Sequence, residues 1–185
     1  TVKLFPHIFR LRPAAHSRTP IEAYSFKIYP EDHFINWQQD PFGNYQARVV
    51  FNERTTELRV EVEVIAKLEV INPFDFFIEE YAEKFPFFYD SKLFKELIPY
   101  LELNENGSLF NAFVAQLAQK KNLITVDFLV FANQLVFQTL KYNIRLEVGV
   151  QTCEETLELQ SGSCRDFAWL LVQALRSIGL ATRFV

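Results

Sequence analysis

The hydrophobic residues of this sequence change their spacing once along the chain, and that change limits the fold more than any other feature. Over residues 1–71 apolar and polar residues alternate, and the longest alternating set is Leu58, Val60, Val62, Val64, Ala66, Leu68 and Val70. Alternation with a period of two predicts β-strands, here with one buried face. After residue 107 the apolar spacing becomes three and four, which predicts helices. The sequence therefore predicts an α+β fold with its strands first.

The strand-rich region carries turn residues between its strands. Residues 40–44 combine Pro41, which fixes φ, with Gly43 and Asn44, which accept positive φ. Residues 52–57 are a second polar turn. Several short strands separated by such turns predict an antiparallel β-sandwich or barrel-like module over residues 1–71.

Residues 72–106 separate the strands from the helices. Pro73 cannot continue a central strand, and residues 73–106 contain eight acidic residues and three lysines among clusters of phenylalanine. We interpret this segment as an aromatic, acidic connector with short helices that its phenylalanines hold against the core. An exposed aromatic binding surface is the alternative interpretation.

Residues 107–185 have the apolar spacing of helices. Ser108 and Thr125 are predicted N-cap residues, each followed by an apolar stripe. Residues 147–162 are a short polar stretch, and a last helix follows it. Ser163 occupies an N-cap position in that helix, and Gly179 is placed to end it. Its predicted buried stripe is Cys164, Phe167, Ala168, Leu171, Ala174, Leu175 and Ile178.

The position of Cys164 at a helix start has two interpretations. The first N–H groups of a helix lack intrahelical partners and carry partial positive charge, which stabilises both a thiolate and an oxyanion. In that interpretation Cys164 is a nucleophile. By residue spacing alone, an ordinary buried cysteine in an apolar stripe is the commoner case.

The residues around Cys164 resemble a known family. Two stretches are similar to the nucleophile helix and next strand of bacterial transglutaminase-like proteins. They are residues 162–171, which begin Gly162-Ser163-Cys164-Arg165-Asp166, and residues 175–185. Residues 149–152 and 155–157 resemble the approach to that helix. Residues 11–13 and 40–44 resemble the β-rich N-terminal region of the same family, and residues 72–77 resemble the linker of its large multi-domain members.

The resemblance implies both a fold and a chemistry. Residues 107–185 would be the helical first half of a papain-like transglutaminase core. Cys164 would be the nucleophile, activated by a histidine and oriented by an aspartate on strands that follow it. Such a site forms a thioester from a protein or peptide amide and passes the acyl group to an amine or to water.

The other titratable residues receive lesser roles. His7, His16 and His33 precede Cys164 in the strand-rich module, and we interpret them as surface or loop residues. Asp166 lies two positions after Cys164, where helical residues do not face each other, so an ion-pair or capping role is predicted. Cys153 lies in the polar approach segment and receives no role.

Both ends of the sequence have the character of cut ends. It begins at Thr1, and it finishes in the apolar run 181–185, predicted to be a strand without its sheet neighbours. We therefore expect an N-terminal fragment of a larger protein, partnered by the remaining C-terminal part and inactive without the downstream histidine and aspartate. Self-association into a homo-oligomer is also expected from the aromatic surface. The alternative is a non-catalytic peptide- or domain-binding module on a degenerate transglutaminase-like scaffold.

Composition excludes several other classes of function. A net charge of −4 offers no basic surface for nucleic acid, and no apolar run approaches the roughly 18–20 residues that cross a membrane. Two cysteines cannot form a disulfide framework, which favours a reducing, cytoplasmic location. No metal is expected because neither cysteine has a neighbouring histidine, and zinc usually takes about four ligands. No cofactor is expected because five glycines leave no glycine-rich phosphate loop.

Overall fold

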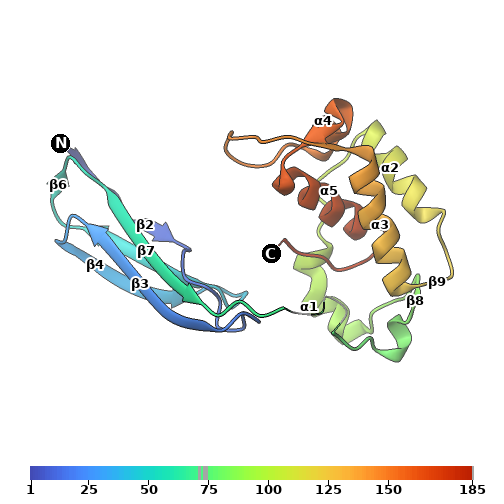
Figure 1. The fold of residues 1–185 in the computed structure, drawn as a ribbon, viewed down its shortest axis with the longest axis horizontal. Helices are drawn as coiled ribbons and strands as arrows, with labels where there is room; N and C mark the ends of the chain where they lie inside the picture. The colour runs from blue at the N-terminus through green and yellow to red at the C-terminus, as the bar shows by residue number, and fades with distance from the viewer. Residues whose placement is uncertain (71, 73–74, 185) are drawn as a thin grey trace. The chain divides into compact units, whose positions relative to one another are not determined.

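The computed structural model describes residues 1–70, 72 and 75–184, and it confirms the α+β class. The chain divides into two compact units, Thr1–Asp75 and Phe76–Val185, here called unit 1 and unit 2. Unit 1 is built of strands, whereas unit 2 is mainly helical (Figure 1). The change of hydrophobic spacing along the sequence therefore corresponds to a change of structural unit.

Unit 1 contains short antiparallel strands. They are β1 (Val2–Lys3), β2 (His7–Phe9), β3 (Ile21–Tyr29), β4 (His33–Gln39), β5 (Tyr45–Phe51), β6 (Arg54–Thr55) and β7 (Arg59–Ala66). They form a sheet of order β2-β5-β4 and the pairs β3-β7 and β1-β6. Ala47, Val49 and Phe51 alternate along β5 and are at most 4% exposed, and Ile28 of β3 packs against them. The core of unit 1 is thus shared by its two larger sheets.

The predicted turn at residues 40–44 joins β4 to β5. Asp40 Oδ1 accepts hydrogen bonds from the N–H groups of Phe42 and Asn44, both at 2.9 Å. Gly43 adopts a φ of +80°, which glycine accepts without a steric penalty. The structure confirms this turn and the residues that make it.

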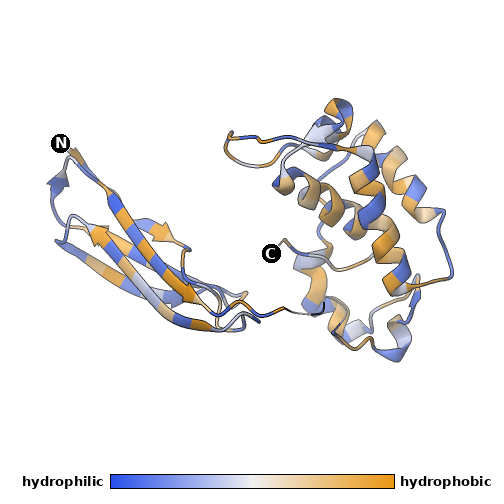
Figure 2. Cartoon of the chain, in the orientation of Figure 1, coloured by the Kyte–Doolittle hydropathy of each residue, from blue (hydrophilic) through white to orange (hydrophobic). Residues whose placement is uncertain are grey.

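Strand β7 does not bury the face that its sequence predicts. Hydrophilic and hydrophobic residues alternate along it, as Figure 2 shows, yet Val62 and Val64 are 39% and 42% exposed. Among the described residues β7 pairs with β3 alone, so in unit 1 it is the edge of a two-stranded sheet. The strand also stops at Ala66, short of the predicted end at Val70.

Unit 2 contains helices joined by very short strands. In chain order they are η1 (Glu80–Ala82), β8 (Lys84–Phe85), α1 (Ser91–Leu101), α2 (Ser108–Ala118), β9 (Leu123–Ile124), α3 (Thr125–Thr139), β10 (Lys141–Tyr142), α4 (Cys153–Leu159), β11 (Ser161–Gly162) and α5 (Cys164–Ser177). Strands β8 and β9 pair antiparallel, whereas β10 and β11 pair parallel. Residues 76–106, interpreted from sequence as a connector, lie within this unit.

The core of unit 2 gathers side chains from four helices. Its fully buried members include Phe110, Phe113 and Leu117 of α2, Phe128 and Ala132 of α3, Cys153 of α4, and Leu170 and Ala174 of α5. The ring of Phe85, from the predicted connector, stacks on Phe128 with 3.9 Å between ring centroids. Most of the apolar stripes predicted for α2 and α3 therefore form the core, although Leu109 and Leu129, which belong to them, are exposed.

The predicted N-caps of α2 and α3 are wrong by one residue. Ser108 and Thr125 are the first helical residues, and the N-caps are Gly107 and Ile124. Glu154 of α4 replaces the local cap of α2, because its carboxylate accepts from the N–H groups of the second and third residues of that helix at 3.0 and 2.9 Å. A distant side chain thus satisfies the donors that a local hydroxyl was predicted to satisfy.

The C-terminal end of α5 matches the sequence prediction, but the strand after it does not. Gly179 adopts a φ of +90°, and the Leu180 N–H donates to the Leu175 carbonyl at 3.0 Å, as in a Schellman motif. No strand is assigned to residues 181–184. The Ala181 N–H donates instead to the Tyr89 hydroxyl at 2.9 Å, and the Thr182 N–H donates to the Tyr100 carbonyl at 2.9 Å. These donors are therefore satisfied outside a β-ladder.

Candidate active site

Cys164 is the first residue of α5, directly after strand β11. Ser163 is the N-cap, as predicted, and its N–H and hydroxyl both donate to Asp166 Oδ2, at 2.8 and 2.7 Å. This reciprocal arrangement is a capping box. Because β11 pairs with β10, the start of α5 is also fixed to the end of α3. The backbone at Cys164 is thus held from both sides.

Asp166 is the most strongly bound side chain at this helix start. Its carboxylate is fully buried and accepts from Arg145 Nε at 3.1 Å, Arg145 Nη2 at 3.0 Å and the Gln151 N–H at 2.8 Å, besides the two Ser163 groups. Burial alone would raise the pKa of Asp166, but these hydrogen bonds outweigh it and hold that pKa well below its ordinary value. The predicted ion-pair and capping role of Asp166 is confirmed.

The loop before the site is tied to the same helix by two arginines. Arg145 Nη2 donates to the Gly149 carbonyl at 2.8 Å. Arg165 Nη2 donates to the carbonyls of Arg145 and Glu147, at 3.2 and 3.0 Å. Loop 143–150 is therefore held beside the start of α5, although its sequence carries no motif that predicts this.

Gly162 allows the chain to pass close to the Asp166 side chain. A Cβ atom at position 162 would lie 2.8 Å from Asp166 Cβ and 3.1 Å from Gln151 Oε1. Contact at 2.8 Å is too short for two carbon atoms, so a larger residue here would push the cap and Asp166 apart. Glycine at this position is required by close packing, not by its φ.

The predicted buried stripe of α5 is only partly correct. Cys164 is exposed, and Phe167, Ala168 and Leu171 are half-buried. Ala174 and Leu175 are buried as predicted, but the other buried residues of α5 are Asp166, Leu170, Val172 and Gln173. Helices α1, α2, α3 and α4 all contact α5.

The exposed face of α5 lines an open cavity of about 670 Å³ with Cys164 in its wall. Phe137 of α3, Tyr142 of β10, and Phe167 and Leu171 of α5 supply apolar wall. The rings of Tyr142 and Phe167 meet edge to face, with 6.4 Å between centroids. The thiol therefore adjoins a space where an apolar group of a ligand could lie.

Cys153, the other cysteine, is buried, whereas Cys164 is exposed. It begins α4, its N–H donates to Glu105 Oε2 at 2.9 Å, and its side chain is part of the core. Burial, with the negative charges of Glu105 and Glu154, raises the pKa of the Cys153 thiol far above its ordinary value. This thiol stays protonated and inaccessible, so we assign it to packing.

The three histidines of the chain all belong to unit 1. His7 and His33 were interpreted as surface or loop residues, but they lie in β2 and β4 and are half-buried. Both rings pack near Phe51, with centroids 5.9 and 6.1 Å away. His16 is exposed in a loop, as predicted. Unit 2, which holds Cys164, contains no histidine.

The described residues offer neither a metal site nor a membrane-spanning helix. No group of three or more His, Cys, Asp or Glu side chains is arranged to hold a metal ion. In the same part of the chain no helix combines the length and the apolar character that crossing a membrane requires.

Comparisons with known proteins agree with the two units. Residues 1–67 match the family model of the bacterial transglutaminase-like N-terminal region, and residues 111–185 match that of the transglutaminase-like superfamily. No curated protein matches the chain. The crystal structure of a candidate cysteine protease from Cytophaga hutchinsonii has a similar fold, with a TM-score of 0.58 and 14% identity.

The alignment with that structure covers 96% of this chain but 60% of the other, so the present chain spans well under two thirds of its length. At this identity the likeness concerns the fold alone. The two family models, one for each unit, carry the assignment. Each unit therefore matches a transglutaminase-like family: unit 1 matches the N-terminal region of the bacterial proteins, and residues 111–185 of unit 2 match the transglutaminase-like superfamily.

Proposed function

We propose that Cys164 is the nucleophile of an acyl-transfer or amide-hydrolysis reaction on a protein or peptide. One observation carries the proposal: Cys164 is exposed at the first position of α5 and lines a cavity, whereas Cys153 is buried in the core. Exposure beside a helix N-terminus is the environment expected of a reactive cysteine. A buried thiol is the environment of an inert one.

The helix start supplies donors for the developing negative charge. The N–H groups of Asp166 and Phe167 donate to the Ser163 carbonyl at 3.1 Å, whereas helical geometry gives Cys164 and Arg165 N–H no intrahelical acceptor. In the proposed reaction the sulfur attacks the amide carbonyl carbon, and these N–H groups stabilise the oxyanion. The C–N bond then breaks, the amine leaves with a proton, and a thioester forms. Water or a second amine resolves the thioester.

Complete turnover needs a general base and acid besides Cys164. The family places a histidine and an aspartate on strands after the cysteine, and unit 2 of this chain contains no histidine. We therefore expect the 185-residue chain to turn over amides slowly or not at all, since loss of triad members costs about three or more orders of magnitude. The half-reaction with an activated ester does not need that acid, because its leaving group departs as a stable anion.

The test is acetylation of the 185-residue chain by p-nitrophenyl acetate. The C–S bond forms as the ester C–O bond breaks and p-nitrophenolate leaves. Intact mass spectrometry should show one acetyl group, and peptide mapping should place it on Cys164. The Cys153→Ala variant is the matched control and should react as the natural chain does, whereas Cys164→Ala should not.

The rate separates a prepared nucleophile from a merely exposed thiol. We expect Cys164 to react about tenfold or more faster than N-acetylcysteine amide, because the helix N–H groups stabilise the oxyanion. A rate no greater than that of the free thiol, or acetylation that Cys164→Ala leaves unchanged, would refute the proposal.

A binding module is the second candidate function. A transglutaminase-like fold does not by itself establish catalysis, and the apolar walls of the cavity beside Cys164 suit the binding of an apolar side chain. The two candidates differ in the acetylation experiment. A binding module has no reason to accelerate acylation of Cys164, so a rate equal to that of the free thiol would favour it.

A further inference from the structure

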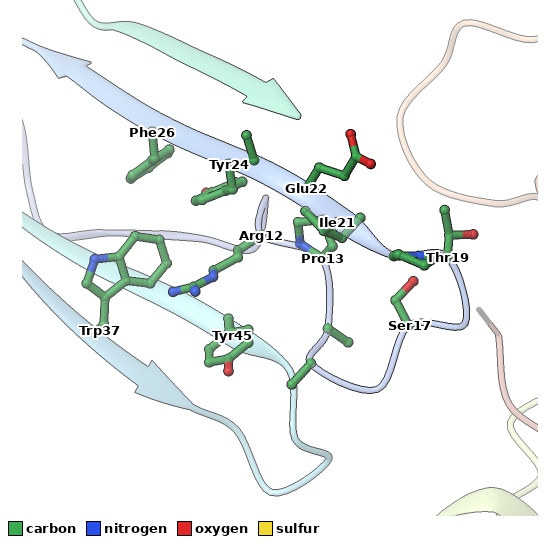
Figure 3. A pocket seen from close by; sticks show the side chains of 14 residues that line it. Arg12, Pro13, Ser17, Thr19, Ile21, Glu22, Tyr24, Phe26, Trp37 and Tyr45 are labelled. Carbon is green, nitrogen blue, oxygen red and sulfur yellow. The ribbon is translucent and has the colours of Figure 1, made fainter. Parts of the chain in front are cut away.

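Unit 1 contains a cavity that the proposed chemistry of Cys164 does not use. Its volume is about 680 Å³, and strands β3, β4 and β5 form it together with the segment from Arg12 to Pro20. Figure 3 shows the Arg12 side chain extending between the rings of Tyr24, Trp37 and Tyr45. All of these residues belong to unit 1, so the cavity does not depend on how the two units are placed.

The three rings hold the Arg12 guanidinium as a cation. Its central carbon lies 5.5, 5.6 and 4.4 Å from the ring centroids of Tyr24, Trp37 and Tyr45. Such distances are those of cation–π contacts, which fix the position of the charge. These contacts occupy the face of the guanidinium and leave the N–H donors at its edge without a protein acceptor among the described residues, open to solvent or to a ligand.

No carboxylate among the described residues forms an ion pair with this cation. Within the part of the chain that the structure describes, Arg12 forms no hydrogen bond and no ion pair, whereas Arg18, Arg59 and Arg145 each pair with a carboxylate. A positioned guanidinium with free donors is suited to a planar anion, which it binds through two parallel hydrogen bonds.

A second feature of the residues that line the cavity is the Tyr24 hydroxyl. This atom is enclosed and has no hydrogen-bond partner among the described residues. Burial raises the pKa of Tyr24, although the charge of Arg12 opposes that shift, so the hydroxyl keeps its proton as a donor. A buried donor without an acceptor is costly, and a ligand oxygen would remove that cost.

We propose that this cavity, called here the Arg12 cavity, binds a carboxylate whose neighbouring group is aromatic or aliphatic. Arg12 and the Tyr24 hydroxyl would donate to the carboxylate, and the rings of Trp37 and Tyr45 would contact the apolar group. Glu22 also lines the cavity, and its negative charge opposes a phosphate dianion about twice as strongly as a carboxylate monoanion. The C-terminal residue of a peptide and a free aromatic acid share this chemistry. The proposal is independent of the proposed function of Cys164.

The experiment is a nuclear magnetic resonance titration of the ¹⁵N-labelled 185-residue chain. Its two tryptophans give separate indole N–H signals. Trp37 lines the cavity, whereas the Trp169 indole donates to Glu105 in unit 2 and serves as an internal reference. The probes are N-acetylphenylalanine, its neutral amide, 3-phenylpropanoate and inorganic phosphate.

We expect N-acetylphenylalanine to move the Trp37 signal saturably and to leave the Trp169 signal in place. Its amide should bind about tenfold or more weakly, because a charged bidentate contact is lost. Binding of 3-phenylpropanoate with equal affinity indicates a free acid as the source of the carboxylate, and weaker binding indicates a peptide C-terminus. An immobile Trp37 signal, equal affinity for the amide, or equal affinity for phosphate would overturn the proposal.

The variants test which groups make the contact. Arg12→Gln should weaken binding about tenfold or more, and Tyr24→Phe should weaken it about fivefold. Arg10→Gln is the matched control: Arg10 is also exposed and lies two residues away, but it does not line the cavity. The dispersion of the remaining unit 1 signals reports whether each variant is folded. If folded Arg12→Gln and Tyr24→Phe both bind like the natural chain, the assignment is wrong.

Discussion

Two helices of unit 2 begin with the same local sequence pattern, yet their cysteines lie in opposite environments. Helix α4 begins Thr152-Cys153-Glu154-Glu155, and α5 begins Ser163-Cys164-Arg165-Asp166. In both, the hydroxyl residue is the N-cap and the acid three positions later completes a capping box. The local pattern therefore fixes the start of each helix in the same way.

The two starts differ in which side chain faces the core. At α4 the cysteine is fully buried and the capping acid, Glu155, is exposed. At α5 the capping acid, Asp166, is fully buried and the cysteine is exposed. A capping box does not specify which face of its helix packs against the core. That choice of face decides which cysteine a ligand can reach. Packing, and not the position in a cap, therefore distinguishes the candidate nucleophile from the buried cysteine.

The largest expected effect separates the two capping acids. Asp166→Ala should lower the free energy of unfolding of unit 2 by about 3 kcal/mol or more, because it removes one partner of a buried ion pair and leaves its donors unpaired. Glu155→Ala should lower the free energy of unfolding clearly less, because the Glu155 carboxylate is exposed and water can replace its hydrogen bonds. Urea unfolding followed by the Trp169 indole signal measures both values. Equal losses would show that the buried network at α5 is no stronger than an ordinary cap.

The pH dependence of stability tests the same network. The folded-state pKa of Asp166 lies below its unfolded value of about 4. Its contribution is therefore complete above that unfolded value and is lost as pH falls through the folded-state pKa. The stability advantage of the natural chain over Asp166→Asn should be constant above about pH 5 and should shrink below it. Urea unfolding at several pH values tests this, and an advantage unchanged down to pH 2.5 would contradict it.

A smaller effect separates the two cysteines. Cys153→Ser should destabilise unit 2 by about 1–3 kcal/mol, because a hydroxyl replaces a thiol in a fully buried apolar site. Cys164→Ser should change stability by less than about 0.5 kcal/mol, because the side chain is exposed. Thermal unfolding of the two variants side by side provides the measurement. A larger loss of stability for Cys164→Ser than for Cys153→Ser would mean that Cys164, and not Cys153, is packed in the core.

The parts of the fold that depend on local sequence were predictable. Period-two alternation predicted the strands of unit 1, and the turn at Gly43 followed from its residues. Gly179 and Ser163 marked the two ends of α5 correctly. Helix α4 was missed within a polar stretch, although Thr152 and Glu155 have the spacing of a capping box and could have revealed it.

The parts that depend on distant contacts were not predictable. Nothing in the sequence indicates that Glu154 caps α2 or that Arg145 pairs with Asp166, because 44 and 21 residues separate these partners. The apolar spacing of α5 fits two overlapping faces, and only part of the predicted face is buried, including Ala174 and Leu175. Cys164 was thus located correctly along the chain but placed in the wrong environment.

The most direct test of this account is thiol alkylation of the folded 185-residue chain. Iodoacetamide reacts with both cysteines in one molecule, so peptide mapping by mass spectrometry gives their relative rates without a second sample. We predict that Cys164 reacts about 100-fold or more faster than Cys153, which is protected by the core, and that the two rates converge in denaturant. Equal rates in the folded chain, or faster reaction of Cys153, would contradict the account.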